Sequence, residues 1–278
     1  MFRSLRIGLA RLWPVRWFWV MLWCVSRIRL AADKAGGMTQ EQSRRPGRLR
    51  LASYNIQKSV GLDLRRRPRR TLQVIEGTGA DLVLLQEADK RLPPRPAALP
   101  HFILDEAGWQ VVDLGGAGSL GWHGNAVIWR GAALTLQDHG HIPLPGLEPR
   151  GAVWALFQTG LGPLRVVGAH LGLTTKARHE QVHHLAEVIA KEPELPTVWA
   201  GDFNEWSRQP VLDHLAPQLR FVPPRASFPA LRPMGALDRI AVSAGLEVVD
   251  SGVYRTRPAH IASDHLPVWA DLVAVDQP

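Results

Sequence analysis

The chain has 278 residues, 46% of them hydrophobic, which is enough to bury the core of one large domain or of two small ones. Eleven of its 33 Lys and Arg residues but only two of its 25 Asp and Glu residues lie in residues 1–50, so the remaining residues are nearly neutral. The basic overall balance is therefore no argument for nucleic-acid binding by residues 51–278. The only cysteine, Cys24, excludes an intramolecular disulfide and a cysteine zinc cluster.

The first element along the chain is an apolar run, residues 17–25, between Arg16 and Arg27. A transmembrane helix needs about 20 apolar residues, so this run is too short to cross a bilayer. Three interpretations stay open: a basic, Trp-rich helix that contacts an anionic membrane surface through residues 11–29, an export signal, and a true start at Met38. We therefore treat residues 1–48 as an extension and linker, and expect a cytoplasmic or peripheral inner-membrane protein unless it is exported.

Residues 49–275 form one predicted domain in which short apolar runs alternate with amphipathic patterns. The apolar runs predict strands over residues 49–54, 81–87, 124–130, 152–157, 164–170, 196–200, 237–242 and 266–272. The amphipathic patterns predict helices over residues 69–77 and from Thr174 or Thr175, as the N-cap, to about residue 191. A proline-rich segment, residues 223–233, predicts a loop. This mixture favours an α/β fold with layered sheets.

Polar side chains suited to acid–base or metal chemistry stand at the ends of the predicted strands. An unpaired buried charge costs several kcal/mol, so charges at strand ends usually face a cleft or a partner. Any one of these side chains is more often a turn residue, a satisfied histidine or a surface group than a functional one. Their ordered recurrence favours a shared site, made of Asn55, Glu87, His170, Asp202 with Asn204, Asp238, and Asp264 with His265.

These residue types fit the hydrolysis of a phosphoester. The reaction must neutralise phosphate oxygens, activate a water and stabilise a leaving alkoxide. The hard oxygen ligands of Glu87, Asp264 and Asn55 suit Mg²⁺. His170 and His265 can donate to phosphate oxygens or transfer protons near neutral pH.

Seven segments resemble, in order, the motifs of the endonuclease/exonuclease/phosphatase superfamily, which includes the deoxyribonuclease I-like and exonuclease III-like enzymes. Each segment alone is weak, but seven ordered matches over about residues 49–275 are specific. Three of the regions, residues 123–127, 170–173 and 227–240, resemble an uncharacterised bacterial subgroup more closely. The seven segments are residues 53–57, 85–87, 124–127, 168–171, 201–204, 237–240 and 263–265.

The resemblance implies a four-layered α/β sandwich, in which two packed β-sheets are flanked by helices. It also implies Mg²⁺ as the cofactor, with Mn²⁺ as a substitute. Glu87 is the implied principal metal ligand, with Asn55 beside it and Asp264 near the metal.

The resemblance also implies roles for five catalytic residues. Asp202 would position or deprotonate the attacking water, and Asn204 would hold the phosphate. His170 would contact the phosphate and protonate the leaving group. Asp238 would orient His265, which would stabilise the transition state or serve as the base.

Two departures narrow the choice of branch. The apurinic-site endonuclease branch has a Lys after its metal-binding Glu, whereas Ala88 follows Glu87 here. That branch also uses a tyrosine in the middle of the chain, whereas the only tyrosines are Tyr54 and Tyr254. A role in abasic-site repair is therefore disfavoured, and the two-histidine branches fit better.

A rival motif lies on the second predicted helix. His179, Glu180 and His183 match the H-E-x-x-H pattern, in which two histidines bind zinc and the glutamate acts as the base of a protease. No H-x-x-G-x-x-H extension follows, and only Glu194 or Glu205 could supply a third ligand. We expect a solvated helix face here, and keep a zinc metalloprotease as the alternative.

The substrate side of the site has two predicted components. Arg65, Arg66 and Arg67 lie one loop after Asn55 and could bind a polyanion such as nucleic acid or anionic lipid head groups, although such a run is usually a solvated face. Asn125 is predicted to contact the substrate as well.

These observations predict a monomeric, Mg²⁺-dependent phosphodiesterase or phosphatase with no obligate protein partner. Its substrate is a phosphoester, either nucleic acid or an anionic phospholipid head group, and the sequence does not separate the two. A catalytically silent module that binds phosphate or a polyanion is the non-enzyme alternative.

Overall fold

The computed structural model describes residues 47–90, 94–116, 118–146, 148–207, 212, 214 and 216–275. The expectations for the N-terminal extension, namely its membrane contact through residues 11–29 and a start at Met38, lie outside these residues. Within the described ranges, no helix is long and apolar enough to cross a membrane.

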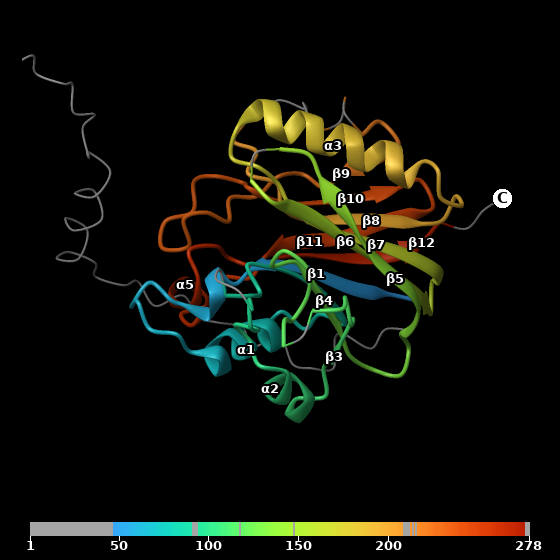
Figure 1. The fold of residues 1–278 in the computed structure, drawn as a ribbon. Helices are drawn as coiled ribbons and strands as arrows, with labels where there is room; N and C mark the ends of the chain where they lie inside the picture. The colour runs from blue at the N-terminus through green and yellow to red at the C-terminus, as the bar shows by residue number, and fades with distance from the viewer. Residues whose placement is uncertain are drawn as a thin grey trace, which may run out of the picture. The chain divides into compact units, whose positions relative to one another are not determined.

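Two six-stranded sheets form the centre of the described domain (Figure 1). The first has the strand order β11-β12-β1-β2-β4-β3, with β1 (Leu49–Asn55), β2 (Leu82–Gln86), β3 (Gln110–Val111), β4 (Ala126–Trp129), β11 (Leu246–Val253) and β12 (Val268–Ala274). The second has the order β5-β6-β7-β8-β10-β9, with β5 (Thr135–Leu144), β6 (Arg150–Thr159), β7 (Gly162–His170), β8 (Thr197–Asp202), β9 (Leu219–Phe221) and β10 (Asp238–Ser243).

Helices cover the outer face of each sheet. Residues of α1 (Pro68–Gly77), α2 (His101–Glu106) and α5 (Ala259–Ala262) pack in one apolar cluster with β1 and β2. On the second sheet, α3 (Thr175–Ile189) packs in another cluster with β6, β7, β8 and β10. The layers are therefore helix, sheet, sheet and helix, and the predicted four-layered α/β sandwich is confirmed.

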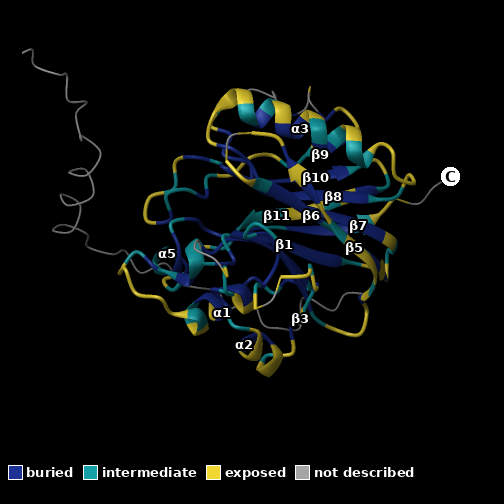
Figure 2. Ribbon diagram, viewed as in Figure 1, coloured by how far each residue is buried: buried dark blue, intermediate teal, exposed yellow. Residues whose placement is uncertain are grey.

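The main core lies between the two sheets. Leu51 and Leu84 of the first sheet belong to one buried cluster with Val166, Val198 and Ile240 of the second. Neighbouring residues on the same strands point to the helices instead, so both faces of the central strands are apolar. Figure 2 shows these strands as almost continuously buried.

The predicted elements are all present, with ends shifted by no more than two residues. Thr174 is the N-cap of α3, and its hydroxyl accepts the backbone N–H of Ala177 at 3.3 Å. The strands β3, β5, β9 and β11 and the short helices α2 and α5 were not predicted. β5 is a polar, largely exposed edge strand that contains Gly140 and Pro143, so it lacks an apolar run.

Strand pairing brings the polar strand ends together. The parallel neighbours β1 and β2 end at Asn55 and just before Glu87. The parallel neighbours β7 and β8 place His170 opposite Asp202, and the antiparallel strand β10 places Asp238 opposite the same residue. The carboxyl ends of β1, β2, β7 and β8 and the start of β10 thus meet at one end of the sandwich.

Candidate active site

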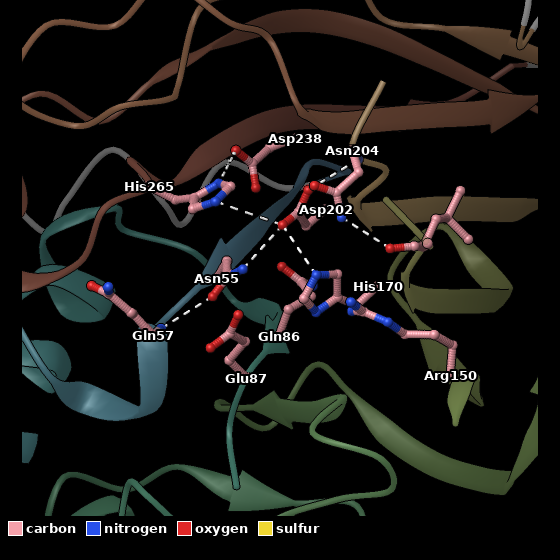
Figure 3. A network of polar contacts seen from close by, with 12 residues as sticks. Asn55, Gln57, Gln86, Glu87, Arg150, His170, Asp202, Asn204, Asp238 and His265 are labelled. Atoms are coloured by element: carbon pink, nitrogen blue, oxygen red, sulfur yellow. Dashed lines mark hydrogen bonds and ion pairs between the residues drawn. The ribbon is translucent and has the colours of Figure 1, made fainter. Parts of the chain in front are cut away.

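Asp202 lies at the centre of the site (Figure 3). Its Oδ2 atom accepts a hydrogen bond from Asn55 Nδ2 at 3.0 Å, and lies 3.4 Å from His170 Nε2 and 3.6 Å from His265 Nε2. Its Oδ1 atom accepts the backbone N–H of Asn204 at 3.0 Å. All of these side chains are buried, so one carboxylate joins groups from both sheets.

His265 is held as an imidazolium. Its Nδ1 atom lies 2.9 Å from Asp238 Oδ2, which also accepts the hydroxyl of Ser227. The ring is tilted against Phe228, with the centroids 4.8 Å apart. Burial lowers the pKa of His265, but the charges of Asp238 and Asp202 outweigh burial and raise the pKa to about 10. The expected pairing with Asp238 is therefore present, and the ring is charged at neutral pH.

His170 has the opposite protonation state. Burial and the charge of Arg150 together outweigh the charges of Asp202 and Glu87 and lower the pKa of His170 to about 4. Figure 3 shows the Arg150 side chain extending toward the His170 ring. At neutral pH, Asp202 consequently lies between a neutral imidazole and the charged ring of His265.

Glu87 forms an ion pair with Lys58. The ammonium group of Lys58 contacts the carboxylate of Glu87, and the backbone N–H of Lys58 donates to the carbonyl of Glu87 at 3.0 Å. Burial raises the pKa of Glu87, but the hydrogen bond and charge of Lys58 outweigh burial, so the pKa lies below its ordinary value. Glu87 is therefore ionised at neutral pH and open to a further cation, since its side chain is 26% exposed.

A strained turn after β1 connects the expected metal ligands. The three residues of the 3₁₀ turn η2 (Gln57–Ser59) all have φ between 45° and 58°, a left-handed conformation that costs roughly 1–2 kcal/mol per residue. Gln57 donates its backbone N–H to Asn55 Oδ1 at 3.1 Å, and its side-chain oxygen accepts the backbone N–H of Asp264 at 3.1 Å. The hydroxyl of Ser263 donates to the carbonyl of Asn55 at 2.7 Å. These contacts fix the ends of β1 and of the segment before β12 against each other.

The donors at this edge fit a magnesium ion. Asn55, Glu87 and Asp264 supply amide and carboxylate oxygens, the ligands that Mg²⁺ prefers. Burial raises the pKa of Asp264, and the charge of Glu87 adds to this effect, while His265 opposes it. The negative charges of Glu87 and Asp264 repel each other, and a bound divalent cation would stabilise the ionised form of both carboxylates.

A second set of possible ligands lies at the centre of the site. Asp202, Asp238 and His265 bring one ligand atom each to within 4.8 Å of one another, and this is the single such group of three in the described part of the chain. Both ring nitrogens of His265 already face carboxylate oxygens, at 2.9 and 3.6 Å. Because the imidazolium already supplies positive charge there, this group suits a divalent cation less well than the oxygen donors at the edge with Glu87.

Two of the predicted amides make internal hydrogen bonds. Asn204 Nδ2 donates to the carbonyl of Leu171 at 2.9 Å, and Asn125 Nδ2 donates to the carbonyl of Gly151 at 3.0 Å. Asn125 is fully buried, and its Oδ1 atom has no hydrogen-bond partner among the described residues. The amides thus hold the walls of the site together, and their contacts with phosphate or substrate stay predictions.

The predicted basic run, Arg65 to Arg67, is exposed beside the turn that carries Lys58. Arg66 Nε donates to the carbonyl of Lys58 at 3.2 Å, and Arg67 Nε lies 3.9 Å from Asp63 Oδ2. The run therefore lies next to the site, and its role in substrate binding stays a prediction.

The H-E-x-x-H motif lies on α3, and Glu180 and His183 each pair with another residue of that helix. His183 Nδ1 lies 3.6 Å from Glu187 Oε2, and Glu180 Oε1 lies 3.8 Å from Lys176 Nζ, both pairs within the helix. No described residue joins His179 and His183 as a third metal ligand. The geometry therefore gives no support to the zinc protease alternative, and the motif fits a solvated helix face.

Four residues of the site were not anticipated from the sequence. Gln57 and Lys58 belong to a turn with left-handed backbone conformation, and the turn contains no glycine from which this conformation could be predicted. Arg150 reaches His170 from the start of β6, and Ser227 reaches Asp238 from the proline-rich loop. The one usable signal was position, because Gln57 is the last residue of the segment that contains Asn55, and Lys58 follows it directly.

Comparison with known proteins places this geometry among related folds. Residues 52–265 match the model of the Endonuclease/Exonuclease/phosphatase family. A search of curated protein sequences gives no match.

Solved structures share the fold at low sequence identity. A family protein from Bacteroides thetaiotaomicron has a TM-score of 0.66 and 20% identity over 82% of this chain and 96% of that chain. A mannosyl-6-phosphatase from the same species has a TM-score of 0.63 and 19% identity over 81% and 99%. The human Nocturnin catalytic domain with bound sulfate has a TM-score of 0.62 and 20% identity over 83% and 96%. Because the family model covers most of the chain, this protein belongs to the endonuclease/exonuclease/phosphatase family.

Proposed function

We propose that the protein is a Mg²⁺-dependent phosphoester hydrolase whose substrate is a phosphodiester. The observation that carries this proposal is the carboxylate of Asp202 between two imidazoles of opposite protonation state, next to the oxygen donors around Glu87. The family contains hydrolases that act on phosphoesters, and this arrangement supplies the groups that such a reaction needs.

The charge of the site supports a requirement for a metal ion. Four carboxyl groups lie in the site against three cations, and one of these, Arg150, is already paired with Glu148 at 3.0 Å, so an anionic substrate requires more positive charge. Mg²⁺, or Mn²⁺ in its place, would be held by Asn55, Glu87 and Asp264, and when bound it neutralises phosphate oxygens and the developing charge. The carboxyl groups are Glu87, Asp202, Asp238 and Asp264, and the cations are Lys58, Arg150 and His265.

The protonation states of the two histidines indicate which groups would accept and donate protons. The oxygen of a water molecule forms a bond to phosphorus and gives its proton to Asp202, while the bond to the leaving oxygen breaks. His265 carries a proton at neutral pH and can stabilise the phosphate oxygens or protonate the leaving oxygen. His170 is neutral, so it suits the expected contact with the phosphate better than the expected proton donation.

The test uses the full-length protein with soluble substrates. Bis-p-nitrophenyl phosphate and p-nitrophenyl phosphate are compared with Mg²⁺ and with EDTA, because a phosphatase shares the fold. Glu87→Gln and His265→Gln should each lower kcat/KM by about 100-fold or more. Glu106→Gln, which removes an exposed carboxylate on α2, is the matched control and should keep its activity. Activity that survives EDTA, or both site substitutions, would overturn the proposal.

A further inference from the structure

Exposed apolar side chains gather around the site. The described residues include eight large apolar side chains that are exposed, and five of them lie in loops that begin or end at site residues. Leu64 is 87% exposed and Met234 is 70% exposed. Scattered exposed apolar residues need no explanation, but a group around one opening marks a contact surface. We call this group, Leu64, Leu173, Trp206, Leu231 and Met234, the apolar rim.

Backbone contacts join two of the loops that carry the apolar rim. The backbone N–H of Leu62 donates to the carbonyl of Ile261 at 2.9 Å, which fixes the loop of residues 61–67 to α5. The backbone N–H of Ala230 donates to the carbonyl of Asp264 at 2.7 Å, just after α5. Figures 1 and 2 show both loops on the same side of the domain as α5, with exposed stretches at their tips.

Side-chain contacts connect the rest of the apolar rim. The ring of Trp206 packs edge-on against Phe228, with the centroids 5.9 Å apart. Arg178 donates to the carbonyl of Leu173 at 2.8 Å and pairs with Glu205, the neighbour of Trp206, at 3.3 Å. The rim is therefore one continuous set of loops around the site rather than separate spots.

The apolar rim is interleaved with positive charge. Arg65 to Arg67 follow Leu64 directly, and Arg232 follows Leu231; all are exposed. The nearby carboxylate of Asp63 is already paired with Arg70 through contacts of 2.8 and 2.9 Å. The surface around the site is therefore both apolar and cationic.

We propose that the apolar rim docks on an anionic phospholipid bilayer, so that the substrate is a phospholipid head-group phosphodiester presented at the membrane surface. Aliphatic side chains beside arginines match a bilayer interface, because the aliphatic groups can enter the acyl-chain boundary while the arginines bind the anionic head groups above it. Trp206 has the side chain most favoured at that depth. A nucleic-acid backbone would use the arginines but would leave Leu64 and Met234 without a partner. The assignment of substrate rests on the proposed phosphodiesterase function, whereas the docking does not.

The first experiment measures membrane docking at single labelled positions and does not depend on catalytic activity. In the full chain with Cys24→Ser, a bimane label is attached at Leu64→Cys, at Met234→Cys or, as the control, at Phe102→Cys, which is exposed on α2. Vesicles of phosphatidylglycerol and phosphatidylcholine in EDTA should shift the emission to the blue at positions 64 and 234 but not at 102. No shift at 64 and 234, an equal shift at 102, or a shift with duplex DNA but not with vesicles would overturn the docking.

The second experiment uses activity on a soluble substrate. Leu64→Ser with Met234→Ser should hydrolyse bis-p-nitrophenyl phosphate at the native rate, as should the control pair Phe102→Ser with Val249→Ser. Anionic vesicles cover the site when the rim docks, so they should inhibit the native protein and the control roughly tenfold more than the rim variant. Equal inhibition of all three would contradict the proposal. A protein without hydrolytic activity refutes the proposed function, and the label experiment still decides the docking.

Discussion

Replacing Lys58 with Met should change the affinities for metal and for phosphate in opposite directions. Two unit charges about 4 Å apart interact by about 4 kcal/mol at an effective dielectric constant of about 20. The side chains of Lys58 and Glu87 are 30% and 26% exposed, so solvent screening reduces this to on the order of 1 kcal/mol. Removing the ammonium from Glu87 should therefore tighten Mg²⁺ binding by about five- to tenfold. Phosphate should bind more weakly by a similar factor, because the site loses one of its few cations.

Titration calorimetry of the full-length variants measures both affinities. Mg²⁺ is titrated first without phosphate, and inorganic phosphate is then titrated at saturating Mg²⁺. Lys58→Arg keeps the charge and should behave like the native protein. Lys176→Met is the matched control, since it removes a lysine from an exposed ion pair on α3. A folded Lys58→Met protein whose Mg²⁺ affinity is unchanged or weaker would refute the reasoning.

Three further substitutions test separate parts of the argument. Asp238→Asn removes the carboxylate that most raises the pKa of His265, so the alkaline limb of kcat/KM, expected near pH 10, should move down by at least one unit; an unmoved limb contradicts this. The buried side chain of Arg50 donates two hydrogen bonds of 2.7 Å to the carboxylate of Asp271. Asp271→Ala removes this ion-pair partner and should lower the free energy of unfolding in urea by about 3–5 kcal/mol. A loss below about 1 kcal/mol would show that the pair contributes little. His183→Ala should keep activity within about twofold, since the side chain is exposed; a loss like that of a site variant would revive the zinc hypothesis.

The strands that carry the site could be predicted because they are buried on both faces. β2 and β8 lie at the centre of their sheets with helices outside, so their apolar runs are continuous, and Glu87 and Asp202 each stand two residues after the last apolar side chain. A charged residue so close to the end of such a run is easy to find. β5 and β11 are edge strands with one exposed face, so their sequences mix polar and apolar residues without a clear period.

The contacts of Lys58 could not be predicted, because they depend on backbone conformation rather than on residue pattern. Three consecutive non-glycine residues in the left-handed region have no sequence signature, and tertiary contacts such as those with Asn55, Glu87 and Asp264 hold them there. The sequence showed that no lysine follows Glu87. It did not show that a lysine from the turn after β1 lies against the same carboxylate.

The protonation states of His170 and His265 could not be predicted from the sequence. His170 and His265 are both buried, and both lie within 3.6 Å of the same oxygen of Asp202, so residue type and this shared contact do not distinguish their protonation states. The difference comes from their second neighbours. His265 has Asp238 on its other nitrogen, whereas His170 has the positive charge of Arg150 nearby. One ring is therefore a cation and the other is neutral at the same pH, and in the proposed mechanism this asymmetry provides a carboxylate that accepts a proton beside a charged imidazole that can donate one.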